Sequence, residues 1–159
     1  MDATERKEIV ERFRSAPGKL ERSIDGLGEY QLEFRPAPGK WNIREIAIHL
    51  CDSEIVAAHR IRRVLAEDDA KLTSYDQDLW ASNLKYGKRN LNNGVELFRL
   101  LRKSTSELFE GLTEADWERT GIHDEHGKMT LLDLVRLYAE HCENHVAQIR
   151  QIRLELSKQ

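Results

Sequence analysis

Hydrophobic residues recur at intervals of three and four positions in four long stretches of the chain, which is the spacing of an amphipathic α-helix. The stretches cover about 4–26, 42–66, 93–111 and 131 to the C-terminus. Helices of this length bury one face each by packing against one another. The pattern predicts an all-α fold, a four-helix bundle, and the length suits one domain that spans 1–159.

Polar residues that cap helices mark where two of these stretches begin. Asn42 is followed three positions later by Glu45, and Thr130 is followed three positions later by Asp133. This spacing is that of a capping box, in which each side chain bonds a free backbone N–H of the first turn. We therefore expect the second and the last long helix to start directly after these caps.

The other two long helices have less regular limits. Pro17 interrupts the first stretch, and proline is favoured in the first turn of a helix. The prediction is one kinked helix, or two helices end to end with Ser15 capping the second. In the third stretch, Asn92 or Asn93 is the expected N-cap, and Gly111 is the expected end.

The connecting segments lack long periodic patterns. The segment 27–41 holds two prolines and two glycines and is predicted to be a loop. The segment 67–91 is polar, and within it 75–84 is predicted to form a short extra helix between the second and third long helices. A further capped turn is expected at 113–118, and 120–129 is predicted to be a loop.

The composition excludes several classes of function. The chain has 25 Lys and Arg against 28 Asp and Glu, and a net charge of -3 gives no electrostatic reason to expect nucleic acid or an anionic membrane as a partner. It has no apolar run long enough for a transmembrane helix, and its charged N-terminus has no signal-peptide core. Two cysteines do not form a disulfide framework. We therefore expect a cytoplasmic protein.

Two histidines, His141 and His145, lie four residues apart in the last helix. Residues four apart are about 40° apart around a helix, and the same stripe carries Leu134, Tyr138 and Ile152. The pair therefore faces the apolar side. A buried histidine can simply hydrogen-bond within the core, but two of them must satisfy four ring nitrogens. A shared metal ion would do so, and both interpretations are open for the pair alone.

A third histidine, His49, lies in the second helix, three residues after Ile46 and seven before Val56. It therefore lies on or beside the apolar stripe of that helix. In a bundle, an inward-facing side chain of one helix can meet an inward-facing pair from another. Three neutral imidazoles with an open fourth position form a site of the catalytic type for Zn²⁺ or a similar divalent ion.

The other residues that often bind metals are less suitable. Cys51 lies about 200° around its helix from His49, and Cys142 lies about 100° from His141 and about 60° from His145. Both cysteines are predicted to be small buried hydrophobic residues. His59 lies beside a run of arginines and is predicted to be on the surface. His123 and His126 precede the last helix and could reach the mouth of a pocket, but we do not expect them to bind the same ion.

The order W-N-I-R-E-I-A-I-H-L-C-D-S-E, then a bundle, then H-C-E-N-H-V-A-Q-I resembles the DinB-like superfamily of metal-binding four-helix bundles over nearly the whole chain. One histidine of that family lies in the second helix, after a W-x-x-x-E element, and two form an H-x-x-x-H motif in the last. The resemblance implies that His49, His141 and His145 bind a divalent metal ion, with zinc or nickel expected. It also implies a possible homodimer, since dimers are common among such proteins.

A narrower resemblance concerns the segment around Y-D-Q-D-L-W-A, which is similar to a branch that contains proteins named as metal-dependent hydrolases and bacillithiol S-transferases. The H-D-E-H-G element at 123–127 fits an H-x-E-x-G motif of that branch imperfectly. The branch implies a low-molecular-weight thiol as co-substrate. Those transferases are richer in histidine near the last motif, where this chain has Asn144 and Gln148.

These features predict a metal-dependent enzyme. Three neutral ligands leave the full charge on the ion, which activates a water, as in a hydrolase, or a thiol, as in an S-transferase, against a small electrophilic substrate. Metal binding should fade below about pH 6, because a ligating histidine must be neutral. The alternative is a metal-stabilised bundle that binds a small molecule or a partner without turnover.

Residues around the predicted metal are candidates for supporting roles. Asp52 or Glu54 could orient the second nitrogen of a ligand or accept a proton, although both could equally be solvated charges on the helix surface. Tyr75, Asp76 and Trp80 follow the second helix, and we expect them to line the pocket, with the two aromatic rings otherwise serving as packing anchors.

Overall fold

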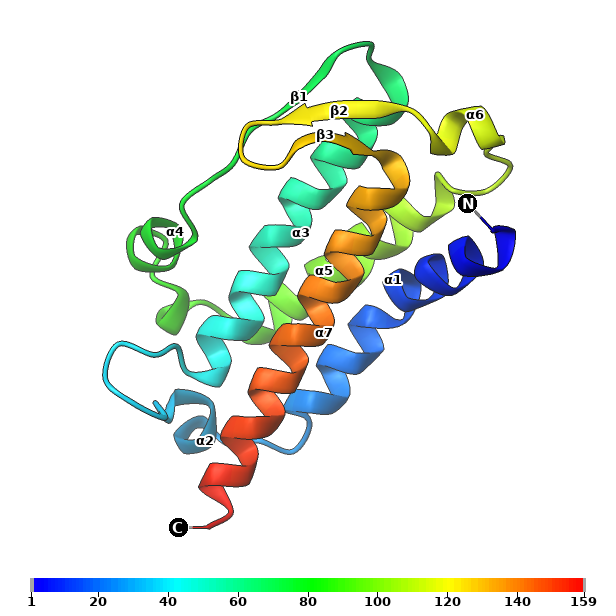
Figure 1. Ribbon diagram of the computed structural model, residues 1–159. Coiled ribbons are helices and arrows are strands. Elements are labelled where there is room, and N and C mark those ends of the chain that lie inside the picture. Colours follow the sequence, from blue (N-terminus) through cyan, green and yellow to red (C-terminus); the bar gives the residue numbers. More distant parts are fainter. Residues whose placement is uncertain (1, 159) are drawn as a thin grey trace.

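The computed structural model describes residues 2–158 and contains four long helices packed side by side (Figure 1). They are α1 (Ala3–Ile24), α3 (Ile43–Ala66), α5 (Leu91–Glu107) and α7 (Leu131–Leu156). Helices α1 and α3 each pack against both α5 and α7. The predicted four-helix bundle is confirmed.

The capping boxes that the sequence predicts are present at the starts of α3 and α7. The Asn42 side chain accepts a hydrogen bond from the backbone N–H of Glu45 at 2.9 Å, and the Glu45 carboxylate accepts one from the backbone N–H of Asn42 at 3.0 Å. Thr130 and Asp133 form the same reciprocal pair. These caps fix the first turns of the two helices that carry the candidate metal ligands.

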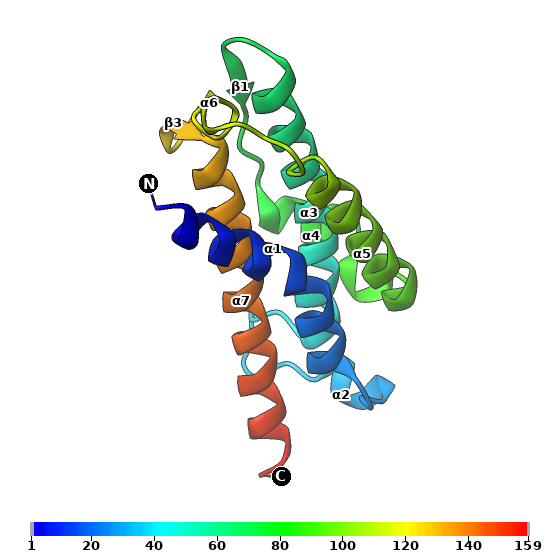
Figure 2. The same cartoon turned by 90° about the vertical axis from the view of Figure 1, so that its right-hand side faces the viewer.

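Helix α1 continues through Pro17 as one helix, with a visible bend along its length (Figure 2). Ser15 does not cap a second helix, because its hydroxyl donates to the carbonyl of Arg12 one turn earlier. Proline has no N–H, so the carbonyl of Phe13 loses its helical donor. Arg102 Nη1 donates to that carbonyl at 3.0 Å. The helix is therefore continuous because a side chain of α5 replaces the missing bond.

Helix α5 begins earlier than the sequence predicts. Its N-cap is Asn90, whose side chain accepts from a backbone N–H of the first turn, while Asn92 and Asn93 lie inside the helix. Gly94 is also helical, and a Cβ atom there would lie 2.8 Å from Ile48 Cδ1. The glycine therefore allows α5 to approach α3 more closely than any other residue would.

A small sheet lies at one end of the bundle, where the sequence predicts only loops (Figure 1). Strand β1 (Ala70–Leu72) pairs in parallel with β2 (Thr120–His123), which forms an antiparallel hairpin with β3 (Gly127–Thr130). Gly121 permits this pairing, since a Cβ atom there would lie 3.0 Å from the backbone oxygen of Ala70. Strands of three or four residues are too short to show a periodic pattern.

Four short helices complete the fold. Helix α2 (Glu29–Glu33) lies within the predicted loop 27–41. Helix α4 (Gln77–Asn83) is the predicted extra helix, and it is followed by the 3₁₀ helix η1 (Tyr86–Lys88). Helix α6 (Glu114–Trp117) is the predicted capped turn. The segment that carries α4 runs along the outside of α3 (Figure 1).

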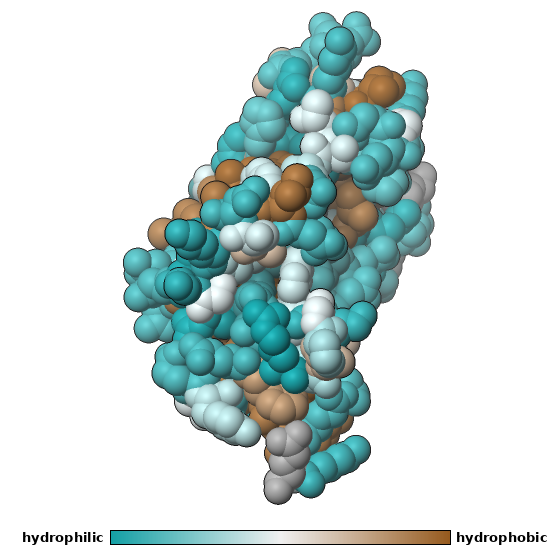
Figure 3. Space-filling view, turned by 90° about the vertical axis from the view of Figure 1, so that its left-hand side faces the viewer, coloured by the Kyte–Doolittle hydropathy of each residue, from teal (hydrophilic) through white to brown (hydrophobic). Residues whose placement is uncertain are grey.

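The buried hydrophobic residues form two clusters within the bundle. Cys142 belongs to one cluster and Ala139 to the other, so His141 lies where the two clusters meet. The face of the molecule that carries α4 is mainly hydrophilic, and hydrophobic residues form separate small patches on it (Figure 3). No helix among the described residues is long and apolar enough to cross a membrane.

Candidate metal centre

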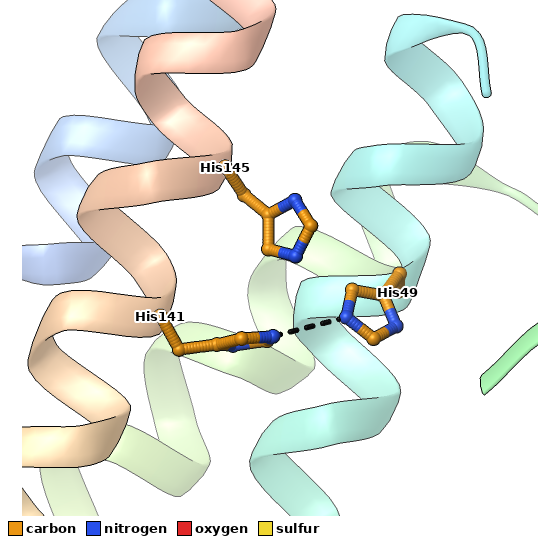
Figure 4. Close-up of side chains that lie close together, drawn as sticks. All are labelled: His49, His141 and His145. Atoms are coloured by element: carbon orange, nitrogen blue, oxygen red, sulfur yellow. Dashed lines mark hydrogen bonds between the residues drawn. The ribbon is translucent and has the colours of Figure 1, made fainter. Parts of the chain in front are cut away.

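Three histidines from two helices come together inside the bundle (Figure 4). His49 projects from α3, and His141 and His145 project from successive turns of α7 toward it. The Nε2 atoms of His49 and His141 are 3.1 Å apart. Each of the three residues offers one ring nitrogen that lies within 4.8 Å of the other two. The structure therefore brings together the three residues that the sequence singled out.

The spacing of these nitrogens fits a tetrahedral metal ion. Zinc–nitrogen bonds of about 2.0–2.1 Å at the tetrahedral angle place two ligand atoms about 3.3 Å apart. The distance of 3.1 Å between the Nε2 atoms of His49 and His141 is close to this value. Without an ion, one of the two rings must donate a hydrogen bond to the other. The donor set therefore suits a divalent metal ion.

Burial keeps the three imidazole rings neutral, which is the form that binds metal ions. The His49 side chain is almost completely buried, and the other two are half-buried. Burial, followed by repulsion from the neighbouring histidines, lowers the pKa of both His49 and His141 to about 3. Burial also lowers the pKa of His145. All three imidazoles are therefore neutral at neutral pH, as ligation requires.

The second nitrogen of His49 has no hydrogen-bond partner. Its Nδ1 is buried and unpaired among the described residues. Both carboxylates that the sequence suggested as partners are engaged elsewhere, since Asp52 accepts from Arg89 at 2.6 Å and Glu54 accepts from Arg102. Neither carboxylate bonds to His49 in this structure, and a role for Asp52 or Glu54 as a proton acceptor stays a prediction.

Two residues without a predicted role contact the histidines. His145 Nδ1 lies 3.0 Å from Gln148 Oε1 and donates to it, which leaves Nε2 of His145 free to face the other two rings. The Trp41 ring lies 4.9 Å from that of His49 and 6.5 Å from that of His145, between ring centroids. Spacing could have indicated Gln148, because it lies three residues after His145 on the same helix.

The residues predicted to line a pocket have different positions. Tyr75 and Trp80 pack together, with 4.4 Å between ring centroids, and both line a pocket of about 410 Å³ that also includes Val56 and Arg60 of α3. Asp76 is exposed, and its carboxylate caps α4 by accepting two backbone hydrogen bonds. Asp76 therefore has a structural partner, and a role for the other two in binding substrate stays a prediction.

The two cysteines lie in the core. Cys51 and Cys142 are completely buried and form no disulfide. Burial raises the pKa of Cys51 to about 12 and that of Cys142 to about 11. Both are therefore protonated at neutral pH, whereas a metal ligand must be a thiolate.

The remaining histidines lie away from these three. His59 is exposed, as predicted. His123, Glu125 and His126 form a second group around the turn between β2 and β3. The Nδ1 atom of His123 accepts hydrogen bonds from the backbone N–H groups of Glu125 and His126, at 3.1 and 3.3 Å. That nitrogen is therefore not free to bind a metal ion.

The fold and the histidine cluster define a class: a four-helix bundle in which one helix contributes a single histidine and the last helix contributes a pair. The model of the DinB superfamily matches residues 12–149. The chain belongs to this superfamily. That 1–159 forms a single domain stays a prediction.

Several bacterial proteins resemble the chain over most of its length. A "Putative metal-dependent hydrolase" of Geobacillus thermodenitrificans is 30% identical over 149 residues, which are 92% of this chain and 83% of that protein. One of the same name from Oceanobacillus iheyensis is 27% identical over 145 residues, 91% of this chain and 84% of the relative. These names and the three histidines support a divalent metal in this chain as well.

Two solved structures share the fold. YfiT from Bacillus subtilis, described as "a probable metal-dependent hydrolase with an unusual four-helix bundle topology", superposes with a TM-score of 0.92 at 21% identity, over 99% of this chain and 90% of its own. A mycothiol-dependent maleylpyruvate isomerase superposes with a TM-score of 0.71 at 8% identity, over 89% of this chain and 59% of its own. At these identities the similarity concerns the fold alone.

Proposed function

We propose that this protein is a metal-dependent enzyme in which His49, His141 and His145 hold a divalent ion, zinc or nickel, and that it acts on a small electrophilic molecule. The observation that carries the proposal is the convergence of three neutral imidazoles, with two Nε2 atoms 3.1 Å apart. When bound, such an ion supplies Lewis-acid activation of a thiol or a water.

The number of ligands favours an enzyme over a purely structural centre. Structural zinc sites have four protein ligands, whereas catalytic sites have three and keep one position open. Within residues 2–158, no cysteine, aspartate or glutamate joins the cluster of three histidines. Two of these histidines, His141 and His145, are only half-buried, which supports an open position on their side. The alternative, a metal-stabilised bundle without turnover, requires that position to be closed.

The comparisons support two kinds of chemistry. The names of the relatives point to hydrolysis, in which the chain would activate water. The shared fold with a mycothiol-dependent isomerase supports a reaction that uses a low-molecular-weight thiol. We favour a thiol S-transferase, with the hydrolase as the second candidate. Thiol consumption in the presence of epoxides, compared with hydrolysis of the same epoxides without thiol, distinguishes the two.

Elemental analysis of purified protein tests the metal site directly. The wild type should contain one equivalent of metal, and His49→Ala, His141→Ala and His145→Ala should each lose it at neutral pH. His59→Ala, which changes an exposed histidine of α3, is the matched control and should retain it. Stoichiometric metal in all three variants would show that the assignment is wrong, as would its loss in the control.

Cobalt substitution separates an enzyme from a closed structural centre. A thiol that reaches the open position of the Co²⁺-loaded protein changes its visible spectrum, because a new ligand enters the coordination sphere. We expect 2-mercaptoethanol to cause such a change. A spectrum that stays the same at saturating thiol would favour the metal-stabilised bundle.

A further inference from the structure

Three arginines of the bundle are almost completely buried, and one of them differs from the others. Arg44 and Arg102 form ion pairs with Glu29 and Glu54. Arg60 is 6% exposed and has no carboxylate within salt-bridge distance among residues 2–158. The positive charge of Arg60 is therefore not balanced by the part of the chain that the structure describes.

The hydrogen bonds of Arg60 all go to neutral groups. Nη1 donates to the hydroxyl of Tyr138 at 2.9 Å, and Nη2 donates to the backbone carbonyl of Thr73. Its Nε–H is buried and has no partner. Keeping a charge out of water without a counter-ion is unfavourable, so a guanidinium in this state is poised to bind an anion. Arginine suits a carboxylate best, since its N–H groups match the two oxygens.

The surroundings of Arg60 form a pocket that can hold such an anion. The pocket has a volume of about 410 Å³, and Tyr75 and Trp80 line it together with Val56. No aspartate or glutamate lines it, and Lys71 adds a second positive charge at an exposed position. The pocket is therefore cationic and aromatic, which favours a small anion with an apolar body.

The pocket lies on the same side of α3 as the metal centre. Arg60 follows His49 by eleven residues, which places the two about 20° apart around the helix and about 16 Å apart along it. Long side chains on a helix tend to lean toward its N-terminus, which for Arg60 is the direction of His49. Tyr138, which accepts from Arg60, packs its ring edge-to-face on His141, with 6.5 Å between centroids. One tyrosine thus connects both sites.

We propose that Arg60 binds the carboxylate of a small substrate whose reacting group lies at the three histidines. The assignment of the reacting end rests on the proposed function, whereas the binding of an anion by Arg60 does not. The carboxylate could belong to the thiol or to the electrophile, and the chemistry that recognises it is the same in both cases.

Binding to metal-free protein tests Arg60 without any need for turnover. In isothermal titrations, succinate should bind at least about 10-fold more tightly than its neutral diamide, as expected for charge-assisted hydrogen bonds. Arg60→Gln should remove this preference, and Arg60→Lys should retain part of it. Lys103→Gln, which removes an exposed positive charge on α5, is the control for net charge and should behave as wild type.

Two results of this titration would overturn the proposal. One is equal binding of succinate and its diamide by the wild type, which needs no variant and so does not depend on how the variants fold. The other is a preference that persists in Arg60→Gln.

Turnover by the metal-loaded enzyme then shows which reactant carries the carboxylate. One series compares ω-mercaptocarboxylates of three to eight carbons with their amides against a neutral epoxide, and the other compares ω-epoxycarboxylates of similar lengths with their amides in the presence of 2-mercaptoethanol. A kcat/KM at least about 10-fold higher for the acid, lost in Arg60→Gln, assigns the carboxylate to that reactant. Turnover with no preference in either series contradicts the proposal. No turnover, with succinate binding that depends on Arg60, contradicts only the proposed function.

Discussion

Helix α3 buries polar groups on two sides, and the two sides differ in how their charges are balanced. On the side that faces α5, Glu54 pairs with Arg102, and both side chains are almost completely buried. On the side that faces α7, His49 has an unpaired buried Nδ1, and Arg60 has no carboxylate partner within residues 2–158. The first group links α3 to α5, whereas the second, as we propose, is complete only when it binds a ligand.

The difference concerns charge rather than the number of hydrogen bonds. Arg102 also donates to the carbonyl of Phe13, and its guanidinium lies 3.7 Å above the centroid of the Phe13 ring. Glu54 Oε1 and Arg102 Nε nevertheless lack partners. The pair is therefore not fully hydrogen-bonded, but its charges cancel within the chain. That cancellation distinguishes this structural ion pair from Arg60, whose charge is not balanced within the described residues.

The largest predicted effect is on stability and concerns the ion pair between Glu54 and Arg102. Glu54→Gln leaves the Arg102 guanidinium buried without a counter-charge, which should lower the free energy of unfolding by about 3–5 kcal/mol. Urea denaturation measures this loss. The folded fraction should still bind one equivalent of metal, because Glu54 does not touch the histidines. A loss below about 1 kcal/mol would show that the ion pair contributes no more than a surface pair does.

Acidification should affect the side of α3 that faces α7, where the histidines are buried. The unfolded chain binds protons at its histidines below about pH 6.5, whereas burial lowers the pKa of His49 and His141 to about 3 in the folded protein. The unfolded state therefore binds more protons in this window, and the stability of the metal-free protein should fall as the pH decreases from about 6.5 to 3.

The same pKa values revise the expected pH dependence of metal binding. The ordinary pKa of histidine predicted a loss below about pH 6, but the buried rings stay neutral well below that. We expect the folded protein to retain its metal to a lower pH, and to lose it together with its fold. Denaturation curves and metal content between pH 4 and 8 measure both. Metal lost near pH 6 from a still folded protein would contradict this expectation.

A smaller effect on stability is expected when an apolar residue replaces His49. His49→Leu removes the buried Nδ1 that has no partner, but it also removes the ring that pairs with His141 Nε2. These effects oppose one another, so the stability of the metal-free variant should stay within about 1 kcal/mol of the wild type. The variant should also lose the stabilisation that added metal gives the wild type. Thermal melts with and without Zn²⁺ measure both changes. A metal-free variant destabilised by more than this would indicate that His49 serves mainly to pack the core.

The smallest predicted effect concerns the orientation of one ligand. Gln148→Ala removes the acceptor for the Nδ1–H of His145, which should weaken metal binding about 10-fold. Competition with a chromophoric chelator measures the affinity. Gln151→Ala is the matched control, because Gln151 lies on the same helix and bonds only to Glu155 in the structure. Equal affinities in the two variants would show that Gln148 does not position His145.

The features that the sequence predicted correctly are those with local causes. The starts of α3 and α7 follow from capping boxes that span four residues, and the inward direction of His141 and His145 follows from helical periodicity. Each needs only information from a few neighbouring residues. The helices and the meeting of three histidines between them could therefore be predicted.

The features that the sequence did not reveal depend on distant partners. The continuity of α1 through Pro17 depends on Arg102, which is far away in the chain. Asp52 looked free to orient a ligand, because its partner Arg89 lies 37 residues later. Arg60 lies in a run of arginines that suggested a solvated surface, and only the packing of the bundle shows that it is buried. Such pairings have no local pattern.

The continuity of α3 has a consequence for selectivity. The helix runs from Ile43 to Ala66 without a glycine or a proline, so it keeps a fixed spacing of eleven residues between His49 and Arg60. With the ion at His49 and the carboxylate at Arg60, the helix would fix the distance between the two sites. A reactant whose carboxylate and reacting atom are too close together could bind at either site but not at both. Chain length, rather than the identity of the reacting group, would then decide which molecules are accepted.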